Sequence, residues 1–192
     1  MRDMDKNVFI EKMELNPIIG ALKDKGELEA IKASQCEIVF VLTTDIFEIE
    51  DTVRQLEQEG KMVFVHFDLI DGISKNQTAL KYIIERVRPH GIITTKSNII
   101  MSAKKLNVLT VQRHFILDSL SLQNTIEVIK ESNPDAVEIM PGLINKVVEK
   151  MKYAIEVPII AGGLIEEKSE VMSCISAGVT AISTTRKHLW NI

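Results

Sequence analysis

The sequence predicts a single (β/α)8 barrel of the TIM type, built as one domain over residues 1–192. Short runs of β-branched and apolar residues recur along the chain, and each is followed by a segment with the 3.6-residue apolar period of a helix. Several runs, such as residues 38–42, are apolar at every position, which is typical of strands covered on both faces. Because a typical barrel has about 250 residues, we expect short loops and a last helix reduced to a stub.

Eight segments fit the strands of such a parallel barrel. In chain order they are Pro17–Leu22, Glu37–Leu42, Met62–Phe67, Gly91–Thr95, Val108–Arg113, Ala136–Met140, Val157–Ala161 and Ala181–Thr184. The first and the fourth carry the weakest pattern. If either failed to form, an open doubly wound sheet would be the alternative fold.

Residues that begin and end helices separate these segments. Thr44 or Asp45 is expected to cap a helix with one apolar stripe, and Gly60 to end it. Ser74 is expected to cap the next helix, which cannot continue through Pro89. Ser97 and Asp118 are expected to begin two later helices, and Gly178 is expected to follow the end of another.

The composition argues against several classes of protein. The net charge is −4 and aromatic residues make up 5% of the chain, so the basic field and stacking surfaces of a general nucleic-acid binder are lacking. Cys36 and Cys174 form no C-x-x-C pair, which argues against a disulfide framework and a metal site. Residues 1–6 carry charges where a secretory signal is apolar, and no apolar run approaches the roughly 20 residues of a membrane span. We therefore expect a cytoplasmic protein with no membrane partner.

The ends of the last two predicted strands carry the residues of a phosphate site. Gly162 and Gly163 follow the seventh strand, while Ser183 and Thr184 end the eighth. Glycines let backbone N–H groups approach an anion closely, hydroxyls add donors, and barrels often hold a phosphate at these two loops. The alternative is that the Gly-Gly pair only forms a tight turn.

Two polar residues of the third predicted strand point to the same side of the sheet. His66 and Asp68 are two positions apart, and with Phe64 they face the barrel interior if the intervening residues pack on the helices. They could contact ligand hydroxyls or form an acid–base pair. A structural hydrogen bond between them explains the pattern equally well, and Asp68 could instead cap a turn that leads to Gly72.

Glu138 interrupts an otherwise apolar strand. A carboxylate that points into a barrel needs a partner, and Lys96 and Arg113, at the ends of the fourth and fifth strands, are the nearest basic candidates. We interpret the three residues as a ligand-site network, with a structural ion pair as the alternative. Pro141 and Gly142 follow directly and fix a turn.

Short basic clusters lie on three predicted helices. They comprise Arg86 with Arg88, Lys104 with Lys105, and Lys146 with Lys150 and Lys152. Most clusters of this kind are solvated helix faces. We interpret all three in that way.

Six blocks in order resemble a known family, the glycerol uptake operon antiterminator regulatory proteins, which are glycerol-3-phosphate-responsive bacterial regulators. The resemblance spans nearly the whole chain, from residue 16 to residue 190. The blocks are HFDLIDG (66–72), TTKSN (94–98), QRHF (112–115), EIMPG (138–142), AGGLI (161–165) and TTRKHLW (184–190).

The resemblance implies a barrel that binds glycerol-3-phosphate without catalysis and needs no other cofactor. In that state it binds the leader of its target messenger RNA, so that transcription reads through a terminator. The phosphate would bind at Gly162, Gly163, Ser183 and Thr184. The rest of the ligand would be contacted by His66, Asp68, Lys96, Arg113, Glu138 and Gly142. We expect a small RNA-binding patch at Lys96, Arg186 and Lys187, completed across a homodimer.

Two other functions remain open at this stage. The same fold hosts isomerases and lyases of small phosphorylated metabolites, with Glu138 as the base and Lys96 or His66 as the electrophile. The barrel could also regulate through a protein partner without any nucleic acid, which its low basicity favours slightly.

Overall fold

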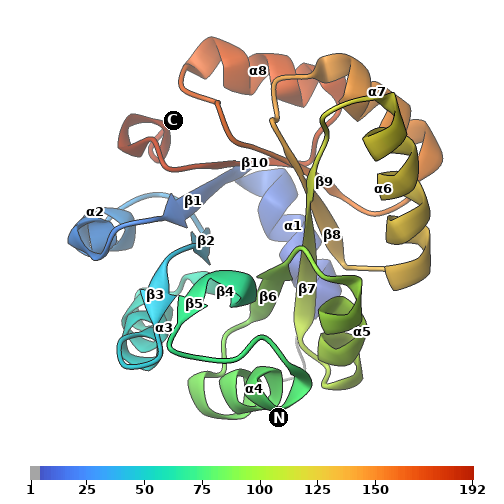
Figure 1. Cartoon of the computed structure of the whole chain (residues 1–192). Coiled ribbons are helices and arrows are strands. Elements are labelled where there is room, and N and C mark those ends of the chain that lie inside the picture. The colour runs from blue at the N-terminus through green and yellow to red at the C-terminus, as the bar shows by residue number, and fades with distance from the viewer. Residues whose placement is uncertain (1–4) are drawn as a thin grey trace.

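Eight parallel strands close into a barrel that helices surround, as the computed structural model of the chain shows (Figure 1). The structure describes residues 5–192, so residues 1–4 of the predicted domain, including most of the charged start, lie outside the described part. The predicted barrel fold is confirmed, and each of the eight barrel strands lies within two residues of its predicted bounds. The barrel strands are β1 (Ile18–Leu22), β2 (Ile38–Val41), β4 (Met62–His66), β6 (Gly91–Thr94), β7 (Leu109–Phe115), β8 (Ala136–Met140), β9 (Ile159–Gly162) and β10 (Ala181–Thr184).

Helices follow the strands around the outside of the barrel, and a two-stranded sheet sits beside the barrel. The α-helices are α1 (Lys6–Leu15), α2 (Leu28–Lys32), α3 (Ile49–Gln58), α4 (Gln77–Tyr82), α5 (Ser97–Lys105), α6 (Ser119–Ser132), α7 (Asn145–Ala154) and α8 (Lys168–Ala177). Shorter helical segments are η1 (Lys25–Glu27), η2 (Phe67–Leu69), η3 (Ile83–Val87) and η4 (Lys187–Leu189), and the small sheet pairs β3 (Thr44–Asp45) with β5 (Ile70–Asp71). The single turn of η4 confirms the expected stub after the last strand.

Alternation along the strands divides the apolar core into two parts. On β4, Val63 and Val65 pack outward with the helices, whereas Phe64 packs with residues of the barrel interior. His66 therefore points to the interior, as the sequence predicted. The lower interior is apolar, with Phe40 against Phe64, and the polar residues are confined to the layer above it.

Helix α1 closes the amino-terminal end of the barrel, and the sequence analysis did not predict it. Figure 1 shows α1 behind the ring of strands. Its Phe9 and Met13, four residues apart and fully buried, belong to the interior cluster. The Phe9 ring lies 4.6 Å from that of Phe64, centroid to centroid. Asp5 caps the helix by accepting a hydrogen bond from Asn7 N.

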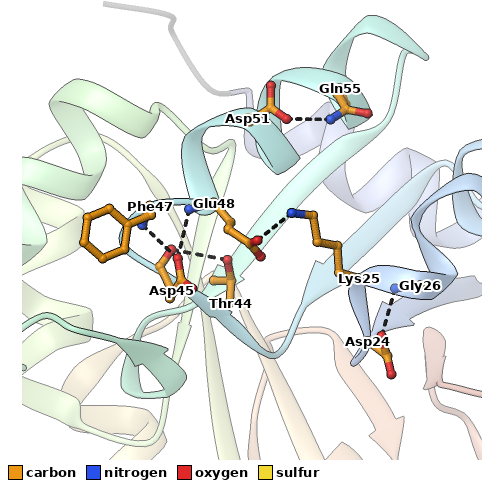
Figure 2. A network of polar contacts seen from close by, with 9 residues as sticks. All are labelled: Asp24, Lys25, Gly26, Thr44, Asp45, Phe47, Glu48, Asp51 and Gln55. Carbon is orange, nitrogen blue, oxygen red and sulfur yellow. Dashed lines mark hydrogen bonds and ion pairs between the residues drawn. The ribbon is translucent and has the colours of Figure 1, made fainter.

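The helix after β2 begins at Ile49, so the predicted start at Thr44 or Asp45 is wrong. These two residues form β3 and pair with β5. The Asp45 carboxylate accepts hydrogen bonds from the backbone N–H groups of Phe47 and Glu48, at 2.8 and 2.9 Å (Figure 2). The Asp45 side chain thus stabilises a turn before the helix and does not cap the helix, because strand pairing holds residues 44–45 extended.

The predicted cap at Ser74 is also wrong. Asn76 caps α4, and its side chain accepts a hydrogen bond from Ala79 N at 3.0 Å. The helix continues as a π-helical turn, η3, and ends at Arg88, which has a left-handed φ of 58°. The helix before β4 ends at Gln58, two residues before Gly60, which has a left-handed φ of 73°, so the end predicted there is confirmed. The three later helix ends are confirmed at Ser97, Asp118 and Gly178.

Within residues 5–192, the structure contains no helix that is long and apolar enough to cross a membrane.

Truncating Phe9 tests the role of α1. We expect Phe9→Ala to lower the free energy of unfolding by about 3–5 kcal/mol, because it opens a cavity beneath the barrel interior. Val8→Ala, on the partly exposed face of the same helix, should cost less than about 1 kcal/mol. Urea denaturation measures both, and equal small losses would show that α1 does not stabilise the barrel.

Candidate functional site

A buried carboxylate lies at the centre of the upper barrel layer. Glu138 of β8 is 0% exposed, and its two oxygens have different partners. Arg113 Nε of β7 donates to Oε2 at 2.5 Å, and the Ser183 hydroxyl of β10 donates to Oε1. The Arg113 side chain is itself only 7% exposed. The interior position that the sequence predicted for Glu138 is thus filled by a satisfied ion pair.

Gly162 of β9 leaves the space that this network needs. Register pairing places Gly162 beside Ser183, and Ile160 beside Glu138. A Cβ atom on Gly162 would lie 2.6 Å from Glu138 Oε1 and 2.8 Å from Ser183 Oγ. Glycine is therefore required here for close packing, which is a different role from the anion contact that the sequence suggested.

A cavity of about 260 Å³ opens above this layer, at the carboxyl ends of β8, β9, β10 and β1. It unites six of the residues predicted for ligand or RNA binding: Arg113, Glu138, Gly163, Ser183, Thr184 and Arg186. Three basic and two acidic side chains line it, the basic ones being Lys23, Arg113 and Arg186. The sequence analysis missed Lys23, although its position directly after β1 was a usable signal.

The loop after β9 forms one wall of the cavity. Gly163 and Leu164 both have left-handed φ angles, 74° and 61°. Thr184 closes the base of this wall, since its hydroxyl donates to Ile165 O at 3.3 Å and accepts from Arg186 N at 3.1 Å. The Thr184 side chain therefore holds two loops together.

His66 is the predicted ligand residue with the most unusual environment. It is 3% exposed, and its Nδ1 has no hydrogen-bond partner among residues 5–192. Burial, together with the positive charge of Arg113, lowers the pKa of His66 from 6.5 to about 4. The imidazole is therefore neutral at physiological pH, although it is not among the residues that line the cavity.

Asp68 has a defined structural role. Its carboxylate accepts hydrogen bonds from the Thr94 hydroxyl, at 2.9 and 3.0 Å, and from Thr95 N at 2.8 Å. It therefore fixes the end of β6. The alternative in which Asp68 caps the turn to Gly72 is wrong, because Asp71 accepts from Gly72 N.

Two further predicted ligand residues do not line the cavity. Lys96 is exposed and forms no ion pair with Glu138. It lies near Lys75, whose pKa is lowered mainly by burial and to a smaller extent by the charge of Lys96. Gly142 donates its N–H to Gly162 O at 2.7 Å, and a Cβ there would lie 2.9 Å from the Cβ of Ala161. Gly142 thus has a packing role.

The residues predicted to contact RNA do not form one free basic patch. Arg186 is paired with Glu166, and Lys187 lies 3.3 Å from Glu27. Lys96 belongs to another side of the barrel mouth, at the start of α5. In the part of the chain that the structure describes, no group of three or more His, Cys, Asp or Glu residues could hold a metal ion.

A closed (β/α)8 barrel with a polar cavity at the carboxyl ends of its strands defines the class of protein, since such barrels carry their functional sites there. The chain belongs to the glycerol-3-phosphate responsive antiterminator family, whose model matches residues 18–190. The resemblance seen in the sequence is therefore confirmed.

Two solved structures with names of this family, and one uncharacterized protein, are similar to the chain. The chain is 34% identical in sequence to a glycerol uptake operon antiterminator regulatory protein from Listeria monocytogenes. The crystal structure of that protein matches with a TM-score of 0.88, covering 91% of this chain and 95% of that one. A glycerol uptake operon antiterminator-related protein from Thermotoga maritima is 33% identical, with a TM-score of 0.81 over 90% and 96%. The uncharacterized protein YgcP of Escherichia coli (strain K12) is 34% identical over 96% of both chains.

Removing one partner of the buried ion pair should be costly. We expect Glu138→Ala to lower the free energy of unfolding by about 3–5 kcal/mol, because Arg113 remains buried and unpaired. A Glu138→Leu, Arg113→Met double variant removes both charges and should recover most of this loss. Chemical denaturation compares the three proteins. A single variant as stable as the wild type would show that the pair is not buried in solution.

Protonation of two histidines, the buried His66 and the half-buried His114, should destabilise the fold in mild acid. His66 and His114 keep pKa values of about 4 in the folded chain, against an ordinary value of 6.5, mainly because of burial. The unfolded chain therefore binds more protons below pH 6.5, and stability is lost as the pH falls from about 6.5 towards 4. Denaturation of a His66→Gln, His114→Gln variant should show a shallower loss over this range. An unchanged pH dependence would contradict the assignment.

Proposed function

We propose that the protein is a glycerol-3-phosphate sensor that, with the effector bound, binds leader messenger RNA and allows read-through of a terminator. The observation that carries the proposal is the cavity itself. Gly163, directly after β9, and Ser183, on the neighbouring strand β10, line one polar space together with Arg113 in a chain of this family. We infer that the phosphate binds there.

Size and charge support a small phosphate ester as the effector. The cavity volume of about 260 Å³ is just below that of pockets for drug-sized ligands, which span about 300–1,000 Å³, and so suits a smaller molecule. The basic residues Lys23, Arg113 and Arg186 outnumber Glu138 and Glu166, which favours an anion. Glu138 gives a carboxylate that can accept hydrogen bonds from glycerol hydroxyls.

The hydrogen bonds of Glu138 with Arg113 and Ser183 could couple effector binding to a change in the conformation of the protein. Without ligand, Glu138 accepts hydrogen bonds from both Arg113 and Ser183. A phosphate in the cavity competes with the carboxylate for these same donors. We propose that the resulting rearrangement of the surrounding loops favours the RNA-binding state, since an effector acts only through its different affinity for the two states.

The remaining predicted ligand residues differ in how directly they could contact the effector. We keep His66 in the proposed site, because its unpartnered Nδ1 is a buried polar group that a ligand hydroxyl would satisfy. Gly162 and Thr184 shape the phosphate site and need not touch the ligand. Asp68, Lys96 and Gly142 have structural roles or positions that favour an indirect contribution.

We propose a sensor and not an isomerase or lyase. The candidate base, Glu138, is held by two donors inside the barrel. Of the two candidate electrophiles, Lys96 lies elsewhere, and His66 is not among the residues that line the cavity. Because leader transcripts are made in the bacterial cytoplasm, the proposal implies a cytoplasmic protein. The expected homodimer remains a prediction that light scattering measures.

Effector binding and RNA binding can be tested together. Calorimetry should detect saturable binding of glycerol-3-phosphate without turnover, and Ser183→Ala should weaken it by about 10-fold or more, as loss of a hydrogen bond to a charged group predicts. Ser102→Ala, on the outer surface of α5, is the matched control. In gel shifts, effector should tighten binding to the operon leader transcript, and rising salt should weaken the complex steeply.

Three results would contradict the proposal. They are turnover of the ester, RNA affinity that is indifferent to the effector, and a complex that forms only with a protein partner.

A further inference from the structure

A second hollow, of about 920 Å³, lies outside the barrel between α3, η3 and the end of α5. It has more than three times the volume of the effector cavity. Arg86, Arg88 and Lys105 line it, and they come from two of the basic clusters that the sequence analysis interpreted as solvated faces. The fold brings them to one place, because η3 packs against α3 and α4 packs against α5 (Figure 1). We call this feature the basic hollow.

Four basic and three acidic side chains line the basic hollow, and among the four basic ones in the described structure only Arg54 forms an ion pair, with Asp51. Glu85 lies 3.7 Å from Lys81, and Glu57 lies 3.4 Å from His90. Within residues 5–192, neither Arg86 nor Lys105 forms an ion pair. An anionic ligand would therefore meet unneutralised positive charge here.

The backbone at Arg88 is unusual for an arginine. The π-helical turn η3 ends at Arg88, whose φ of 58° is left-handed, a conformation that glycine or asparagine normally fills. Arg88 N donates to Ile83 O at 3.1 Å to close the turn. π-Helical turns and residues held in rare conformations are enriched at functional sites.

The hollow also has an apolar floor, made by Ile84, Val87 and Leu106. A flat base can lie on such a surface or against a guanidinium plane, while arginine and lysine bind the neighbouring phosphates. Glu50 and Glu85 offer acceptors for the amino groups of bases. An inorganic anion would contact only the basic side chains, whereas a nucleotide would contact the basic side chains, the apolar floor and the carboxylates.

We propose that the basic hollow binds a single-stranded segment of RNA, with phosphates at Arg86, Arg88 and Lys105 and a base over the apolar floor. The inference rests on the proposed function. It replaces the patch at Lys96, Arg186 and Lys187, of which the last two are already paired with carboxylates.

The position of the hollow lets RNA and effector bind together. The lining residues 105–107 directly precede β7, and the same strand carries Arg113 at its other end, where it reaches the effector cavity. The two ligands therefore use different donors. One rigid element connects the two sites.

Crosslinking tests the location. A pool of random 30-nucleotide RNA containing 4-thiouridine is irradiated with the full-length protein and glycerol-3-phosphate, and crosslinked peptides are identified by mass spectrometry. We expect crosslinks within residues 82–88 and 104–107. Crosslinks only at residues 96 or 185–188, or only on α7, would overturn the inference but leave the proposed function standing. No crosslinks in the presence of bound effector would overturn both.

Matched variants give an independent measure. Arg86→Ala with Lys105→Ala should weaken binding of the same RNA pool at least 10-fold and lower the slope of log affinity against log salt by about 1.4, as loss of two single-strand phosphate contacts predicts. Lys146→Ala with Lys150→Ala removes two charges from a smaller hollow of about 270 Å³ beside α6 and serves as the control. Effector affinity, measured by calorimetry, should be unchanged in both. Equal loss in the two variants, or loss only in the control, would overturn the inference.

Discussion

The charge of Glu138 inside the barrel is the constraint on which the upper half of the structure depends. A carboxylate with no exposed surface must be matched by donors, which are Arg113 on the neighbouring strand β7 and Ser183 on β10, two strands away on the other side. Gly162 has no side chain because any Cβ would collide with this network. The same donors border the cavity above, so the groups that satisfy the carboxylate are also those available to an anion.

Much of the fold follows from periodicity in the sequence. Parallel strands covered on both faces have short, nearly continuous apolar sequences, and this pattern predicted all eight barrel strands. Local chemistry was less reliable. Asp45 has the capping residue type but forms a turn before the helix, since pairing of β3 with β5 holds it extended. Helix α1 escaped notice because only Phe9 and Met13 mark its buried face, among charged neighbours.

The candidate site was predictable to the extent that strand ends identify it. Gly163, Ser183 and Glu138 were found because parallel strands gather their carboxyl ends. Sequence cannot show how far each side chain reaches, however. Asp68 is used to hold Thr94 and Thr95, while Lys23 lines the cavity, and only its position directly after β1 marks it in the sequence.

A crystal structure of the protein with bound glycerol-3-phosphate would test the central claim most directly. We expect phosphate density at the carboxyl ends of β9 and β10, within hydrogen-bonding distance of Ser183 and the Gly163 loop, with Glu138 released from at least one of its two donors. Density for the ester at any other place, with the Glu138 contacts unchanged, would contradict the assignment of this cavity.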